Sequence, residues 1–129
     1  MNQFIILLGS NLDAEKNMAE ACRILVMTFP DGIRFSEIHR SATLVKKGCP
    51  IPKGECATYL NVVCKLQSER TLEDIQLFLK HTETRMGRVR GVEGLGCVTI
   101  DLDLVEWNGT VLRPKDAAQG YYKVCLGDL

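Results

Sequence analysis

The sequence lacks long apolar runs, an excess of charge of either sign, and more than a few aromatic residues. Lys plus Arg and Asp plus Glu each number 16, so the formal net charge is zero. A general nucleic-acid-binding protein would carry a clear basic excess, and a sheet that stacks RNA bases would need more rings than the 6% present here. No apolar run approaches the length that spans a membrane. We therefore expect neither a nucleic acid nor a membrane as a partner, and the oligomeric state stays open.

Two missing motifs exclude further classes of site. No C-x-x-C pair is present, which excludes zinc-knuckle and thioredoxin-like spacings. The motif G-x-x-x-x-G-K-[ST] is also absent, which excludes a P-loop enzyme. The apolar run at residues 4–8 is too short for the core of a signal peptide. We interpret the cysteines as reduced, mostly buried thiols of a cytoplasmic protein, with a disulfide scaffold or a Cys49–Cys56 redox pair as alternatives. The six are Cys22, Cys49, Cys56, Cys64, Cys97 and Cys125.

Hydrophobic periodicity predicts four strands and two helices in one domain, residues 1–129. The strands are expected over residues 2–8, 33–41, 59–67 and 97–107, with a short addition at 110–112. One helix should follow a cap at Ser10, Asn11 or Asp13 and end at the Pro30 turn; the other should begin after Thr71 and end at Gly87. Residues 44–58, rich in Lys, Gly and Pro, predict a long surface loop.

The resulting order is β-α-β-β-α-β, which predicts an α+β, ferredoxin-like fold: an antiparallel sheet with two helices on one face. The residues after 112 are too few and too irregular in pattern to predict more than a short closing segment. The second face of the sheet would then be free. With the loop over it, that face is the expected platform for a ligand.

Two carboxylates mark the strand expected at residues 97–107. Its residues alternate, so Asp101 and Asp103 share one face, roughly 7 Å apart along the strand. Asp is a poor strand former, and two like charges on one face repel each other. A cation between them would offset that cost, and two oxygen ligands suit Mg²⁺, which takes its other ligands from water and phosphate. A solvated sheet face with two incidental acids is the alternative.

Cationic and aromatic residues accompany this pair. Arg88 and Arg90 lie two residues apart in a glycine-flanked stretch, and Arg is suited to bidentate binding of phosphate. Glu83 stands on the helix end before them. Tyr59 and Asn61 share one face of the third strand, where a ring and an amide could bind a flat heterocycle, and Tyr121-Tyr122 offers a second ring. Taken singly, each of these features is also typical of a solvated turn or of ordinary packing.

Four motifs together resemble the 6-hydroxymethyl-7,8-dihydropterin pyrophosphokinase family, in its order and close to its spacing. From the first to the last they span most of the chain, and they read Leu8-Gly9-Ser10-Asn11-Leu12, Tyr59-Leu60-Asn61-Val62-Val63, Glu83-Thr84-Arg85-Met86-Gly87-Arg88-Val89-Arg90 and Ile100-Asp101-Leu102-Asp103-Leu104. The resemblance implies a ferredoxin-like fold and transfer of pyrophosphate from ATP to the pterin hydroxymethyl group, with release of AMP.

The resemblance also implies roles for individual residues. Asp101 and Asp103 would hold two Mg²⁺ ions, and Arg88 would stabilise charge in the transition state. The nucleotide would be bound by Lys80, Glu83, Arg88 and Arg90. The pterin would be bound by Ser41, Tyr59, Asn61 and Tyr122. The expected partners are therefore small molecules, ATP and the hydroxymethyl-dihydropterin.

The chain departs from the family pattern in three places, so it resembles a divergent, C-terminally short member. The family's R-W-G-P-R is replaced by residues 94–98, Gly-Leu-Gly-Cys-Val, and its His-x-Asp by Pro114-Lys115-Asp116. The family's closing segment is lacking. Two alternatives follow: a non-catalytic relative that binds a pterin or nucleotide, and a plain ferredoxin-like interaction module.

Overall fold

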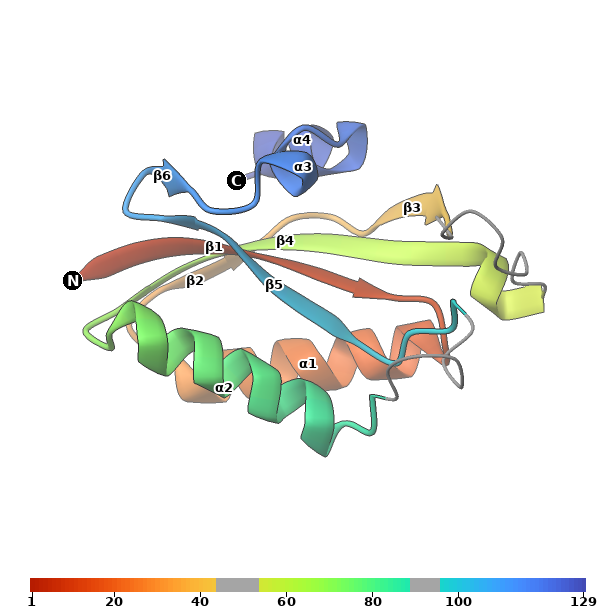
Figure 1. Cartoon of the computed structure of the whole chain (residues 1–129), viewed down its shortest axis with the longest axis horizontal. Helices are drawn as coiled ribbons and strands as arrows, with labels where there is room; N and C mark the ends of the chain where they lie inside the picture. Colours follow the sequence, from red (N-terminus) through yellow and green to blue (C-terminus); the bar gives the residue numbers. More distant parts are fainter. Residues whose placement is uncertain (44–53, 89–95) are drawn as a thin grey trace.

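The computed structural model describes residues 1–43, 54–88 and 96–129. Within these residues an antiparallel sheet has the strand order β2-β4-β1-β5-β6, and β3 also pairs with β4 (Figure 1). Its strands are β1 (Asn2–Ser10), β2 (Ile33–Phe35), β3 (His39–Ala42), β4 (Thr58–Ser68), β5 (Asp101–Trp107) and β6 (Thr110–Val111). Most of the predicted loop at 44–58, the Arg90 position and most of the glycine-rich connection lie outside the described residues.

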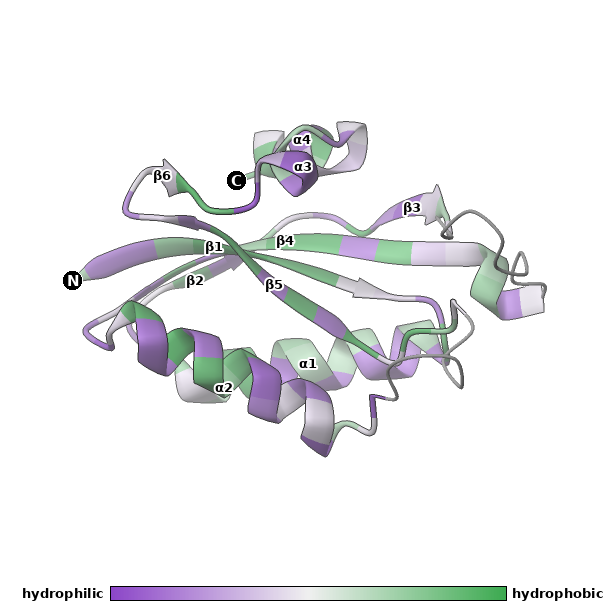
Figure 2. Ribbon diagram, viewed as in Figure 1, coloured by the Kyte–Doolittle hydropathy of each residue, from purple (hydrophilic) through white to green (hydrophobic). Residues whose placement is uncertain are grey.

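The apolar run of β1 is continuous because this strand is central and buried on both faces. Phe4, Ile6 and Leu8 belong to the larger core cluster on one side of the sheet, and Ile5 and Leu7 to a smaller cluster on the other. Figure 2 shows the contrast: β1 is largely hydrophobic along its middle, whereas α2 alternates between hydrophobic and hydrophilic stretches. A strand covered on both faces needs no polar side, which is why its sequence does not alternate.

Helices α1 (Ala14–Thr28) and α2 (Leu72–Arg85) cover one face of the sheet, as predicted (Figure 1). Each turns an apolar stripe toward the sheet, and the buried helical residues in this core are Met18, Ala21, Leu25, Ile75 and Leu79. Thr71 caps α2, its side chain accepting a hydrogen bond from the Asp74 amide at 3.2 Å. Asp13 stands at the N-cap position of α1 without a side-chain capping bond.

The other face of the sheet is not free, which corrects the sequence-based expectation. The chain after β6 forms α3 (Pro114–Ala117) and α4 (Gly120–Gly127), and both lie over that face (Figure 1). Tyr122 and Cys125 of α4 pack there on Ile5, Leu7 and other residues of the smaller cluster. Because both helices are short, they cover only part of the face.

The strand predicted over residues 33–41 is wrong as a single element, since it is interrupted between β2 and β3. The cause is Ser36. Its amide donates to the Val63 carbonyl at 2.9 Å, and its hydroxyl accepts from the Val63 amide, also at 2.9 Å. A side-chain oxygen therefore replaces the main-chain carbonyl in the ladder, and residues 36–38 belong to neither strand.

These elements confirm the ferredoxin-like α+β fold and the short strand predicted at 110–112, which is β6; helices α3 and α4 were not predicted. The turn before β6 uses Asn108 (φ 48°) and Gly109 (φ 84°), as the Asn-Gly pair predicts. No helix in the described parts of the chain is long and apolar enough to cross a membrane.

Candidate active site

The sheet register brings the predicted polar residues into one row. Gly9 of β1 pairs with Asn61 on one side and with Asp101 on the other. Two residues earlier in β1, Leu7 pairs with Asp103. Directly paired residues point to the same face of a sheet, so Asn61, Asp101 and Asp103 share the face that α3 and α4 only partly cover. The alternation predicted for β5 places both carboxylates there, while Leu102 and Leu104 enter the helix-covered core.

The absence of a side chain at Gly9 makes room in this row for an aromatic ring. A Cβ atom added to Gly9 would lie 2.3 Å from Cε1 of Tyr59, a separation that real Cβ atoms do not show. The Tyr59 ring therefore lies over the main chain of β1. Burial is the main cause that raises the pKa of the Tyr59 hydroxyl well above its usual range, and the Asp101 charge adds to it. The Tyr59 hydroxyl therefore stays neutral.

A first cavity of about 450 Å³ opens at this position. That volume suits a small ligand. Its lining includes three of the four predicted pterin-binding residues, Ser41, Tyr59 and Asn61, together with both aspartates. The lining residues are Leu7, Gly9, Ser41, Ala42, Thr43, Tyr59, Asn61, Gly96, Val98, Asp101, Asp103, Asp116, Gln119 and Tyr121.

Asn61 is oriented by its neighbours in β3. Its amide nitrogen donates to the His39 carbonyl at 3.1 Å and to the Ser41 hydroxyl oxygen at 2.9 Å. Both hydrogens of that nitrogen are thus used within the protein. The amide oxygen is then the atom of Asn61 best placed to accept a hydrogen bond from a ligand.

Tyr122, the fourth predicted residue, does not line this cavity; its neighbour Tyr121 does. Tyr122 is 4% exposed and belongs to the smaller core cluster, together with Cys125 one helical turn later. The spacing of these two residues could have assigned Tyr122 to the buried side of α4. The Tyr121 ring stacks near His39, with centroids 6.4 Å apart and planes 27° apart.

A second cavity, of about 700 Å³, contains the predicted nucleotide-binding residues that the structure describes. Lys80, Glu83 and Arg88 line it, and it shares Asp101 and Asp103 with the first cavity. The two cavities therefore meet at the carboxylate pair. The full lining is Gln76, Leu79, Lys80, Glu83, Thr84, Arg88, Asp101, Leu102, Asp103, Leu104, Leu112 and Arg113.

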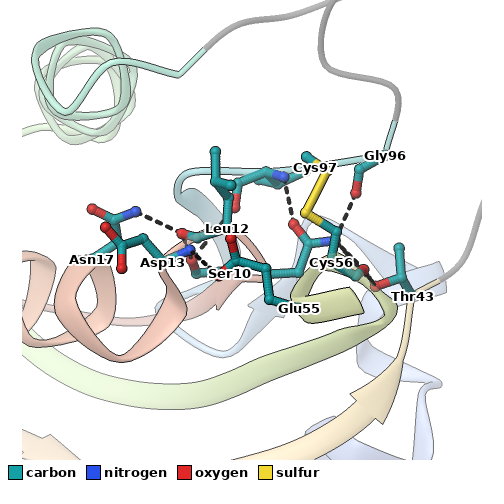
Figure 3. Close-up of a disulfide and its surroundings, with 11 residues drawn as sticks. Ser10, Leu12, Asp13, Asn17, Thr43, Glu55, Cys56, Gly96 and Cys97 are labelled. Atoms are coloured by element: carbon teal, nitrogen blue, oxygen red, sulfur yellow. Dashed lines mark hydrogen bonds between the residues drawn. A yellow bond between two sulfur atoms is a disulfide. The ribbon is translucent and has the colours of Figure 1, made fainter. Parts of the chain in front are cut away.

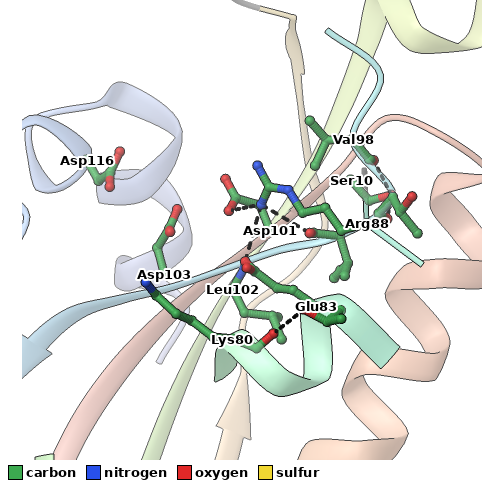
Figure 4. Close-up of polar contacts among 12 residues, drawn as sticks. Ser10, Lys80, Glu83, Arg88, Val98, Asp101, Leu102, Asp103 and Asp116 are labelled. Carbon is green, nitrogen blue, oxygen red and sulfur yellow. Dashed lines mark hydrogen bonds and ion pairs between the residues drawn. The ribbon is translucent and has the colours of Figure 1, made fainter. Parts of the chain in front are cut away.

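Arg88 is held between two carboxylates at this junction (Figure 4). Its Nη1 atom lies 2.5 Å from Oδ1 of Asp101 and 3.2 Å from Oε2 of Glu83. Glu83 is only 4% exposed, and the same Oε2 accepts the Leu102 amide at 2.8 Å. Within the described residues, the buried Nε of Arg88 has no hydrogen-bond partner. Glu83 thus fixes Arg88 to β5, and the sequence did not predict its burial.

Asp103 lies in an environment that favours a bound cation. Burial, and next the charge of Asp101, raises the pKa of the Asp103 carboxyl to about 7, with Asp116 adding to the effect and Arg113 opposing it. Two carboxylates facing one space satisfy the oxygen preference of Mg²⁺. No group of three or more His, Cys, Asp or Glu suited to a metal gathers among the described residues. An ion held here would therefore complete its coordination with water and substrate oxygens, which is how Mg²⁺ usually binds in phosphate chemistry.

Ser10, the last residue of β1, and Asn11, which follows it, join the walls of the first cavity and do not cap α1. The Asn11 amide nitrogen donates to the carbonyls of Cys56, at 2.9 Å, and Gly96, at 2.6 Å, and its oxygen accepts from the Val98 amide. Ser10 Oγ donates to the Thr99 carbonyl at 2.6 Å. One buried turn thus ties the 3₁₀ turn η1 (Gly54–Ala57) to the segment that enters β5.

A disulfide between Cys56 and Cys97 crosses the same junction (Figure 3). The interpretation of the cysteines as reduced thiols is wrong for this pair, because the two residues are brought together only by the tertiary fold. Cys22, Cys64 and Cys125 are free, and Cys49 lies outside the described residues. The cytoplasmic location inferred from the same interpretation stays a prediction.

The fold and the site together define a class: a ferredoxin-like α+β domain that presents acidic and cationic side chains between two ligand-sized cavities. A family model described as 7,8-dihydro-6-hydroxymethylpterin-pyrophosphokinase (HPPK) matches residues 5–128. The chain belongs to this family, whose members are ATP-dependent pyrophosphokinases of folate synthesis. No curated protein matches the sequence well enough to count as a relative.

Proposed function

We propose that this chain transfers pyrophosphate from ATP to 6-hydroxymethyl-7,8-dihydropterin, giving AMP and the pterin diphosphate. The observation that carries the proposal is the meeting of two cavities at Asp101 and Asp103. A transfer between two bound molecules needs their reacting atoms side by side. Two separate pockets with one shared wall satisfy that requirement.

The first cavity is proposed as the pterin site. The rings of Tyr59 and Tyr121 would stack on the flat heterocycle, with Tyr121 in the role predicted for Tyr122. Asn61 would accept a hydrogen bond from the polar edge of the pterin, and Ser41, bonded to Asn61 at 2.9 Å, would hold that amide in place. The lining of rings, apolar side chains and a few oriented polar groups supports this assignment.

The second cavity is proposed as the nucleotide site, with Lys80 and Arg88 as cations for the triphosphate. Glu83 would act indirectly, since its carboxylate is engaged by Arg88 and the Leu102 amide. Arg90, which the family resemblance also assigns to the nucleotide, lies outside the described residues. The expected cofactor is Mg²⁺, two ions by the family resemblance, held by Asp101 and Asp103.

In the proposed reaction the pterin hydroxymethyl oxygen attacks the β-phosphorus of ATP. The new C–O–P linkage forms as the bond from the β-phosphorus to its bridging oxygen with the α-phosphorus breaks, and AMP leaves with that oxygen. The hydroxyl proton is lost to solvent. Bound Mg²⁺ supplies charge neutralisation at the phosphate oxygens. Arg88, already oriented by Asp101 and Glu83, adds a fixed positive charge where negative charge accumulates.

The test is AMP formation by the purified chain with Mg-ATP and the hydroxymethyl-dihydropterin. Asp101→Asn and Asp103→Asn should each lower the rate by about 100-fold or more, equivalent to about 2.7 kcal/mol of transition-state stabilisation. Asp31→Asn, at an exposed turn residue, makes the same change of charge away from both cavities and should leave the rate unchanged.

Calorimetric titration separates the remaining outcomes. Pterin or nucleotide binding without AMP formation would favour the alternative, a non-catalytic binding protein that has kept the pocket. A chain that binds neither small molecule would refute both the enzyme and the binding protein.

A further inference from the structure

Arg113 stands at the edge of the nucleotide cavity, in a position that neither the sequence motifs nor the family roles assign. It follows β6 at the N-cap of α3 and lines the second cavity, with its side chain 50% exposed. The amides of Leu112 and Arg113 both point to the Val105 carbonyl, at 2.7 and 3.4 Å. This segment is therefore anchored to β5 two residues beyond Asp103.

The guanidinium of Arg113 lies between two carboxylates. Its Nε donates to the carboxylate of Asp116, three residues later, and its Nη2 lies 3.8 Å from Oδ1 of Asp103. The contact with Asp116 fixes the direction of the side chain. The contact with Asp103 is an ion pair too long for a hydrogen bond and half open to solvent, and such pairs are weak.

Of the two arginines that the structure describes in the second cavity, Arg113 is the one placed to exchange partners. Arg88 is engaged at 2.5 and 3.2 Å by Asp101 and Glu83, and its side chain is only 14% exposed. Arg113 contacts Asp103 loosely, yet it is aimed at the cavity by Asp116. A divalent ion that binds Asp103 competes with Arg113 for the same carboxylate, since both are cations.

We propose that Arg113 is a nucleotide-phosphate-binding residue that neutralises Asp103 in the ligand-free protein. When a divalent ion takes Asp103, the guanidinium is released to a phosphate oxygen of the nucleotide in the same cavity. The site thus keeps a cation beside Asp103 in both states. The inference rests on the proposed function, because it requires the second cavity to bind a metal-nucleotide complex.

The test compares Arg113→Gln with Lys115→Gln. Lys115 lies two residues later and lines neither cavity, so its substitution removes one positive charge without touching the site. Mn²⁺, used alone as a paramagnetic probe for the Mg²⁺ site, should bind Arg113→Gln about 3-fold more tightly than wild type, because a competing cation is gone. The complex of Mg²⁺ with α,β-methylene-ATP should bind Arg113→Gln about 5- to 10-fold more weakly, because a phosphate contact is lost. Lys115→Gln should change both affinities by less than about 2-fold.

Arg113→Gln is expected to bind Mn²⁺ more tightly and the nucleotide more weakly, whereas simple damage to the site would weaken both. Weaker binding of both Mn²⁺ and nucleotide by Arg113→Gln would overturn the inference, as would values equal to those of Lys115→Gln. Arg113→Lys keeps the charge and should restore nucleotide binding to within about 3-fold of wild type; no restoration would also count against it. A wild-type chain that binds neither Mn²⁺ nor the nucleotide analogue would refute the proposed function and the inference together.

Discussion

Reduction of the Cys56–Cys97 disulfide should destabilise the protein without dismantling its fold. The two cysteines are 41 residues apart in the sequence. Closing a loop of that length removes conformational entropy from the unfolded chain equivalent to about 4 kcal/mol at 25 °C. At roughly 2.1 cal/mol/K of unfolding entropy per residue, that loss lowers the melting temperature of a chain of this size by about 15 °C.

The folded state should survive because the joined segments have a second connection. Asn11 bonds the carbonyls of both Cys56 and Gly96, so the η1 turn and the segment entering β5 stay together when the sulfur–sulfur bond opens. We therefore expect a lower free energy of unfolding with pterin affinity nearly unchanged at 25 °C. Residual structure in the unfolded chain makes the 4 kcal/mol figure an approximate upper limit.

The assay is urea unfolding with and without dithiothreitol, followed by circular dichroism. A Cys56→Ser/Cys97→Ser variant is the matched control, since reductant should not shift its transition. Thiol titration of the unfolded protein should find two fewer reactive thiols before reduction than after it. If two thiols appear but the transition does not move, the loop-entropy reasoning is refuted. If no thiols appear, the disulfide does not form in solution.

Three further perturbations probe the site. Gly9→Ala places a methyl group in the space of the Tyr59 ring and should weaken pterin binding by about 10-fold, measured by fluorescence titration, with nucleotide binding unchanged. Asp103→Asn should stabilise the metal-free protein at pH 8 and leave it unchanged near pH 3 in urea unfolding. Because the pKa of Asp103 is raised from 3.8 to about 7, the native state binds the extra proton between these values, and wild-type stability falls as pH rises through that window. Glu83→Ala should cost about 3 kcal/mol of stability, because it removes one of the two carboxylates that engage Arg88 and also the acceptor of the buried Leu102 amide.

Each of these predictions has a contradicting result. Equal loss of pterin and nucleotide affinity in Gly9→Ala would mean that the sheet, and not the ring, is disturbed. If the free energy of unfolding depends on pH in the same way in wild type and Asp103→Asn, burial does not hold the proton on that carboxyl. Wild-type stability in Glu83→Ala would show that water replaces the buried carboxylate.

The parts of the fold and site that the sequence predicted are those controlled by local pattern. The strand predicted over residues 97–107 begins only at Asp101, but the alternation within it was enough to put Asp101 and Asp103 on one face. The helix cap at Thr71 and the turn at Asn108 were also predicted, because each depends on residues next to it in the sequence. Alternation in β4 likewise placed Tyr59 and Asn61 on one face, and both line the first cavity.

The parts that were missed depend on contacts between distant segments. The partner of Cys56 is chosen by the fold and not by spacing, and the break at Ser36 depends on a side chain reaching β4. Helix α3 is too short for periodicity to reveal it, and the spacing of Tyr122 and Cys125 is the main sequence signal for α4. Adjacent helical residues point about 100° apart, so the cavity is lined by Tyr121, whereas the predicted Tyr122 is buried beneath α4.

The central place of β1 has a consequence for synthesis of the protein. This strand leaves the ribosome before its partner strands, since Leu7 pairs with Val63 and with Asp103, which lie 56 and 96 residues later. Until β4 and β5 have been synthesised, the five apolar residues 4–8 have no strand to pair with. Nascent chains arrested before β5 should therefore remain protease-sensitive and bind chaperones, and native structure should form late and cooperatively.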